Sequence, residues 1–191
     1  MKNSAVLLAL SLLCVTLPLR ADELADAKAL ASQLVQRLGA TLKQEMSAHG
    51  PEGAVGVCRD VAPSIASELS RQSGGKVARV SLKTRNPLLG TPDAWEQQVL
   101  LEFDRRLAAG EKTESLEYFE TVSEPNGRYL RYMKALPVQP LCLSCHGASE
   151  NIPDAVKAKL AAEYPHDRAT GYQAGAVRGA VTVKLPGGAT P

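Results

Sequence analysis

The chain has 191 residues, of which 45% are hydrophobic and 22% are charged, so it is long enough to bury the core of one globular domain. Its 22 basic and 20 acidic side chains give a formal net charge of +2. A chain this close to neutrality gives no electrostatic reason to expect nucleic acid or an anionic membrane surface as a partner.

The first 21 residues have the three-part layout of a secretory signal peptide: Lys2, an apolar run over residues 5–17, and a small residue, Ala21, at the cut site. The run is shorter than the ~20 residues that span a bilayer, so we expect cleavage and no stable membrane anchor afterwards. Cleavage would remove Cys14 and two basic residues. This predicts an exported, periplasmic protein whose mature part, residues 22–191, is one domain.

The next segments predict helices. Apolar residues recur at helical spacing from Asp22 to His49, and Gly50-Pro51 ends that pattern. A second helix is predicted from about Pro51 to Arg71, with a kink or break near Pro63, because proline cannot continue the hydrogen-bond pattern of a helix interior. Cys58 belongs to the apolar stripe of this second helix, so its thiol is expected to face inward.

Residues 76–85 alternate between apolar and polar side chains, which predicts a half-buried strand. Arg79, Lys83 and Arg85 would then share one face of it. The elements expected downstream are a helix over 91–110, strands over 116–122 and 128–138 joined by a Pro-Asn-Gly turn, a helix over 152–164 and a strand over 175–185. Helices followed by an antiparallel hairpin and a closing strand predict an α+β domain rather than an all-helical cytochrome c.

Residues 142–146, Cys-Leu-Ser-Cys-His, form the attachment signature of a c-type haem. The thiols of Cys142 and Cys145 can form thioethers to the two vinyl groups, and His146 can then bind the iron as proximal ligand. A zinc site would need further cysteines or histidines at suitable spacing. A thioredoxin-like dithiol would follow the first strand of a βαβ unit, which is not the order predicted here. We therefore expect one covalent haem c as cofactor.

With Cys142 and Cys145 assigned to haem and Cys14 removed, Cys58 is the one thiol left. It is either a small buried hydrophobic residue or a thiolate ligand to iron opposite His146, and the residues alone favour neither. His166, in the loop before the last strand, is its main rival as distal ligand. The less favoured rivals are His49, Met46 and Met133. The two methionines fit apolar stripes and are expected in the core.

Several further side chains are candidates for contact with the haem. Arg79, Lys83 and Arg85 would suit its propionates, because guanidinium groups bind carboxylates in a bidentate manner. A solvated strand face is the alternative, and Arg178 is a weaker candidate for the same role. Trp95 and Tyr132 are expected in the core or in a haem wall, and the residues expected to shape turns are Asp167, Gly171, Gly175 and Gly179.

Six blocks match one family pattern in order over nearly the whole mature chain. They are Val57-Cys58 with Ala62-Pro63, Arg79 to Pro87, Asp93 to Glu96, Arg131 to Lys134, Cys142 to Gly147, and Tyr164-Pro165 through Gly171-Tyr172 to Arg178-Gly179-Ala180. Together they resemble the PAS-like periplasmic c-type haem domains, which often serve as sensor inputs of signalling proteins. The resemblance implies a PAS-like antiparallel sheet flanked by helices, one covalent haem, and Cys58 as second axial ligand. We expect this protein to differ from the sensor members of that family, with no transmembrane helix, kinase or other output module attached.

These observations predict a periplasmic mono-haem protein with His/Cys-ligated iron that acts in redox sensing, small-ligand sensing or electron transfer. An unidentified redox or signalling protein is the expected partner, and a small gas is a candidate ligand of the reduced iron. Paired carboxylates, a Ser-His-Asp order and a phosphate-binding glycine loop are all missing from the sequence, so we expect no substrate chemistry. The alternatives are a haem oxidoreductase acting on small sulfur compounds and a five-coordinate gas-binding cytochrome.

Overall fold

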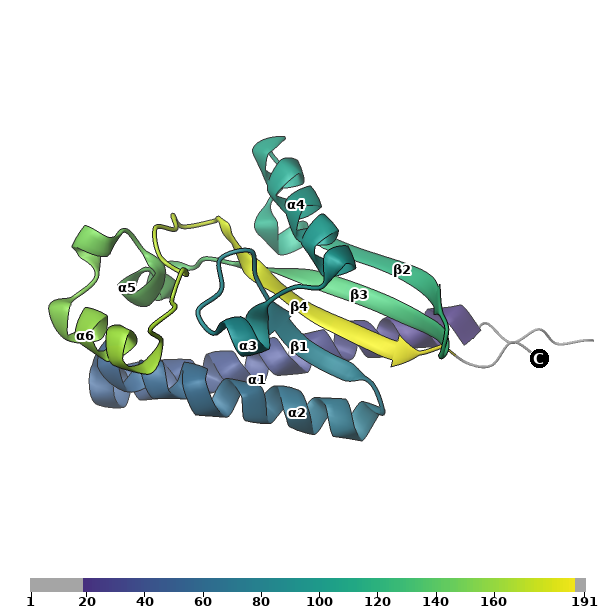
Figure 1. Ribbon diagram of the computed structural model, residues 1–191, viewed down its shortest axis with the longest axis horizontal. Coiled ribbons are helices and arrows are strands. Elements are labelled where there is room, and N and C mark those ends of the chain that lie inside the picture. The colour runs from purple at the N-terminus through teal and green to yellow at the C-terminus, as the bar shows by residue number, and fades with distance from the viewer. Residues whose placement is uncertain (1–18, 188–191) are drawn as a thin grey trace, which may run out of the picture.

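A computed structural model describes residues 19–187 as one antiparallel sheet covered by helices on both faces (Figure 1). Nearly all of the predicted signal peptide, including Cys14, lies outside the described residues. The helices are α1 (Leu19–Gly56), a π-helical turn (Val57–Val61), α2 (Ala62–Ser73), α3 (Pro87–Gly90), α4 (Ala94–Ala108), α5 (Leu143–His146) and α6 (Asp154–Glu163). The strands are β1 (Lys76–Val80), β2 (Glu117–Glu124), β3 (Gly127–Pro137) and β4 (Val177–Pro186).

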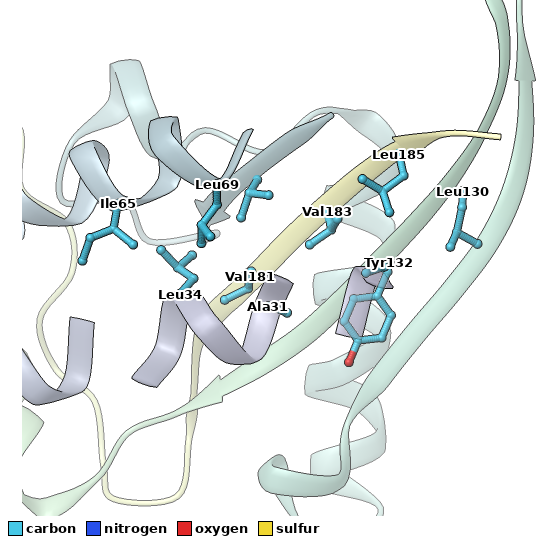
Figure 2. Close-up of a cluster of buried hydrophobic side chains, with 11 residues drawn as sticks. Ala31, Leu34, Ile65, Leu69, Leu130, Tyr132, Val181, Val183 and Leu185 are labelled. Atoms are coloured by element: carbon cyan, nitrogen blue, oxygen red, sulfur yellow. The ribbon is translucent and has the colours of Figure 1, made fainter. Parts of the chain in front are cut away.

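The strands pair in the order β1-β4-β3-β2, and every neighbouring pair is antiparallel. Successive residues of a strand point to opposite faces, so Tyr132 and Val183 face the α1–α2 layer while Met133 and Ala180 face α4. Figure 2 shows the first of these cores, where β3 and β4 meet residues of α1 and α2. The α+β prediction, with its long N-terminal helix, is confirmed.

The long helix α1 has the predicted interruption at Gly50, whose backbone is left-handed (φ 69°) and is followed by Pro51. The break predicted near Pro63 is displaced upstream, to the π-helical turn Val57–Val61. Pro63 instead stands in the first turn of α2, where a missing N–H costs little. Within residues 19–187, no helix has a stretch long and apolar enough to cross a membrane.

The strand predicted over 76–85 is wrong in its second half, because β1 ends at Val80. The Ser81 hydroxyl donates to the Arg178 carbonyl (2.8 Å) and accepts the Lys83 N–H (3.2 Å), which turns the chain out of the sheet. The Ser81 N–H bonds to the Gly90 carbonyl instead of a neighbouring strand (3.0 Å). Of the three basic residues expected on one face, only Arg79 is therefore in a strand.

The remaining elements start and end close to the predicted positions. Asp93 caps α4 and forms a reciprocal capping box with Glu96. β2 and β3 are joined by the two residues Pro125 and Asn126, with Gly127 at φ 139°. Tyr132 is a core residue, and Trp95 packs beside Arg131 on the α4 side of the sheet, so neither belongs to the large cavity described below.

Gly179 in β4 approaches β1 so closely that a Cβ there would lie 2.3 Å from the Val80 carbonyl oxygen, and its φ is +152°. Gly179→Ala is expected to lower the free energy of unfolding by at least roughly 1–3 kcal/mol, since it adds a clash to a strained backbone. Gly39→Ala is the control, because a Cβ there meets nothing within 4 Å in helix α1 and should stabilise by roughly 0.5–1 kcal/mol. Urea unfolding of both variants measures the difference, and equal stabilities would contradict the placement of Gly179.

Candidate functional site

A cavity with a volume of about 890 Å³ lies between the α1–α2 layer, β1, α3 and the haem-motif segment. This size is near the upper end of the roughly 300–1,000 Å³ of small-molecule and cofactor pockets. Its walls are mostly apolar, with contributions from Leu34, Leu38 and Val181. We call it the motif cavity, because Cys142, Cys145, His146 and Cys58 all line it.

The haem-motif segment is held in a compact form by two short helical turns. A 3-10 turn over Pro140–Cys142 leads directly into α5, and the Gly147 N–H closes α5 onto the Leu143 carbonyl (2.9 Å). In Figure 1, α5 and α6 lie at one end of the molecule, and the described chain starts and stops at the other. The Cys145 Sγ lies 4.0 Å from the carbonyl oxygen of Pro51, so the motif meets the interruption in α1.

The imidazole of His146 is fixed by its Nδ1 atom, which lies 2.6 Å from the carbonyl oxygen of Ala169. A carbonyl only accepts, so Nδ1 carries the proton and Nε2 has a free lone pair. Burial lowers the pKa of His146 well below its usual range, and the nearby charges of Arg178 and Arg85 lower it further. The ring is therefore neutral near pH 7, and its Nε2 atom can bind a metal.

Cys58 also lines the cavity, although it is far from the motif in the sequence. It lies in the π-helical turn between α1 and α2. Such turns often occur at functional sites, because the extra residue redirects a side chain. Burial raises the pKa of Cys145, the charge of Arg85 offsets part of this, and a negative charge on Cys58 would raise it further. The pKa of Tyr164 is raised to about 12, again by burial first and then by Cys58. Cys58, Tyr164 and the motif residues all line the same cavity.

Two guanidinium groups in the cavity wall, those of Arg79 and Arg178, have no carboxylate within ion-pair distance among residues 19–187. Arg178 donates to the Ser81 hydroxyl (3.0 Å) and to the Lys83 carbonyl (3.2 Å). Its Nε atom also lies 3.2 Å from Nδ1 and 3.5 Å from Nε2 of His146, and a protonated Nδ1 cannot accept a hydrogen bond from it. Burial lowers the pKa of Arg178, followed by the charges of Arg85 and Arg79, so this wall is rich in positive charge.

The other predicted basic contacts are placed differently. Arg85 lines the cavity, but its guanidinium group is bonded to Asp167 (3.0 Å) and to the Cys145 carbonyl. The ammonium group of Lys83 bonds to the Thr170 carbonyl and lies 4.5 Å from the centre of the Tyr172 ring, outside the cavity lining.

The rival candidates for distal ligand differ in whether they line the cavity. His166 is exposed, and neither it nor His49 contributes to the cavity wall. Met133 is buried in the core against α4, as its apolar pattern predicts. Met46, expected as a core residue, is half-buried and lines the motif cavity.

Comparison with known proteins places the chain in a family. The family model described as Tll0287-like matches residues 20–186. The chain belongs to the Tll0287-like family. Among solved structures, the crystal structure of the cyanobacterial heme-protein Tll0287 is similar, with a TM-score of 0.61 and 28% sequence identity. The similarity covers 90% of this chain and 96% of that one, and the comparison with curated proteins found no match.

The family match spans the three motif residues predicted to hold the haem and its iron, Cys142, Cys145 and His146, and also Cys58. Sequence reasoning missed the contacts that hold His146, namely the Ala169 carbonyl and the neighbouring ring of Tyr172 (6.3 Å between centres). A backbone carbonyl has no residue-specific signal. Within residues 19–187, no three His, Cys, Asp or Glu side chains gather as a site for a bare metal ion.

Proposed function

We propose that this protein is a periplasmic c-type haem protein, in which Cys142 and Cys145 hold the haem and His146 and Cys58 are its axial ligands. One observation carries the proposal: a cavity of about 890 Å³ is lined both by the two cysteines and the histidine of the Cys-x-x-Cys-His motif and by a thiol from a distant segment. Membership of the Tll0287-like family supports it, because Tll0287 is a heme-protein. The PAS-like description of the sheet is part of the same proposal.

The donor set of the cavity fits a haem. His146 offers a neutral imidazole with a free Nε2 lone pair, and its Nδ1 proton is held by a backbone carbonyl, the usual support of a metal-binding histidine. The apolar walls suit a porphyrin face, and Arg79 and Arg178 can offset the charge of two propionates. When bound, the haem would supply an iron that accepts and releases one electron.

The protein's own residues would tune that iron. As ligands of the iron, His146 and Cys58 would set its potential, and the apolar lining would limit its contact with water. No aspartate or glutamate side chain is among the described residues that line the cavity, so its wall offers no carboxylate pair for acid–base chemistry. We therefore propose redox sensing, small-ligand sensing or electron transfer as the role, with a second protein as redox or signalling partner.

Protein produced with its signal segment in a host that attaches haem is expected to keep the haem through acid–acetone extraction, because thioether bonds survive denaturation. Its mass should equal the processed polypeptide plus one haem, as measured by mass spectrometry. The same chain produced in a compartment without attachment machinery serves as the control. Haem that extracts freely, or a mass of polypeptide alone, would refute the proposal.

A further inference from the structure

Asp167, Ala169 and Arg85 form a closed ring of hydrogen bonds that begins and ends at the haem motif. His146 Nδ1 donates to the Ala169 carbonyl (2.6 Å), and the Ala169 N–H donates to Oδ1 of Asp167 (2.7 Å). The other carboxylate oxygen, Oδ2, accepts from Nε of Arg85 (3.0 Å). Arg85 then donates through Nη2 to the carbonyl of Cys145, the residue before His146.

The ion pair in this ring is buried: the side chain of Arg85 is 8% exposed and that of Asp167 is 12% exposed. A buried pair of this kind adds little net stability over an apolar pair of the same size, because both groups lose their hydration. Its specific geometry is a better explanation for its presence. One carboxylate holds the backbone on the N-terminal side of Ala169, while the carbonyl on the other side meets His146.

The whole loop from Tyr164 to Tyr172 is fastened around this ring. The Arg168 N–H bonds to the Thr84 carbonyl (2.9 Å), beside Arg85. The Tyr172 N–H bonds to the carbonyl of His146, the last residue of the motif, also at 2.9 Å. Backbone hydrogen bonds at Arg168 and Tyr172 thus fix the chain on both sides of the Ala169 carbonyl. The carboxylate of Asp167 adds a charged contact to the same loop.

We propose that Asp167 and Arg85 are positioning residues for His146. They lock the Ala169 carbonyl onto Nδ1, which fixes the tautomer and plane of the imidazole and strengthens it as an iron ligand. The negative charge of Asp167 favours the ferric state, and the charge of Arg85 limits this effect. This inference rests on the proposed function, and it gives Arg85 a role other than contact with a propionate.

The test compares Asp167→Ala with a matched control, Asp93→Ala. Asp93 likewise accepts one backbone N–H, from Glu96 (2.8 Å), and pairs with a buried arginine, Arg131 (2.6 Å), but it lies in the cap of α4. In the haem-loaded protein, the readouts are the exchange rate of the His146 Nδ1 proton by NMR and the midpoint potential. Thermal melting measures the loss of stability that both variants share.

Asp167→Ala is expected to speed Nδ1 proton exchange and to raise the potential, whereas Asp93→Ala should change neither. Outer-shell changes weaken metal binding by about 10–100-fold, and a tenfold loss confined to the ferric state raises the potential by about 59 mV. Asp167→Asn retains an acceptor for the Ala169 N–H, so it should raise the potential with slower exchange than Asp167→Ala.

An Asp167→Ala protein with covalent haem, unchanged exchange and unchanged potential would overturn the inference while leaving the proposed function intact. If Asp167→Ala does not fold, Asp167→Asn decides, and an unchanged potential in that variant would likewise overturn it. The absence of covalent haem from the unaltered protein would overturn the proposed function instead.

Discussion

The double variant Cys142→Ala/Cys145→Ala is expected to contain no covalent haem and to melt well below the parent protein. Both thiols line the motif cavity, and the third thiol described there, Cys58, lies outside the Cys-x-x-Cys-His motif that thioether attachment requires. The remaining ligands would bind haem reversibly, so the haem would be removed by extraction under denaturing conditions.

The loss of stability follows from the size of the cavity. A ligand that binds only the folded state stabilises it by about 4.1 kcal/mol at a thousand times its dissociation constant. A tethered group has a high effective concentration and therefore acts at the upper end of this range. Without it, about 890 Å³ between α1, α2 and the sheet must hydrate or collapse.

Ser144→Ala is the control for this prediction, because Ser144 lies between the two cysteines and is not part of the cavity wall. It should attach haem and melt like the parent. Visible absorption after acid–acetone extraction and a thermal melt give both results. A double variant that retains haem after extraction, or melts together with Ser144→Ala, would be inconsistent with the proposed attachment.

The sequence predicted those parts of the fold that depend on short-range patterns. The cap at Asp93, the turn at Pro125-Asn126 and the interruption at Gly50 are local signals, and each is present in the structure. The end of β1 depends on Ser81 meeting Arg178, 97 positions along the chain. Alternation of apolar and polar residues continues past Val80, so no local signal marks that end.

The site was predictable to the extent that its residue types are specific. The Cys-x-x-Cys-His motif predicts haem attachment by itself, and Cys58 was singled out as the one thiol left over; the structure places these residues in one cavity wall. The pairing of Arg85 with Asp167 joins two segments 82 positions apart, and neither residue type is specific for that role. The prediction that Arg79, Lys83 and Arg85 share one strand face was wrong, because β1 ends at Val80 and leaves Lys83 and Arg85 outside the strand.

Replacing Cys58 is expected to change both the spin state and the potential of the haem. With Cys58 as a thiolate ligand, the ferric iron should be six-coordinate and low-spin, because both axial positions are filled. The negative charge of a thiolate stabilises ferric iron, so the potential should lie well below that of His/Met cytochromes. Cys58→Ala should therefore give a high-spin or water-bound ferric form with a raised potential, and Cys58→Met should raise the potential too.

The structure supplies the controls for this experiment. His166→Ala should leave the spectrum unchanged, since His166 is exposed and outside the cavity wall. Met46→Leu tests the other side chain that lines the cavity and could reach iron. Visible absorption and electron spin resonance of the ferric proteins compare the four variants, and redox titration gives their potentials.

The position of Cys58 also predicts what happens on reduction. The thiolate should take up a proton or weaken its bond to ferrous iron, opening a site that carbon monoxide or nitric oxide can enter. Cys58 is carried by a π-helical turn between the interruption at Gly50 and Pro63, so its release would act on a segment already irregular in its hydrogen bonding. Two ligation states on such a segment are what a redox or gas sensor requires. If Cys58→Ala matches the parent in absorption and spin resonance, Cys58 is a packing residue, and the two-state proposal fails with it.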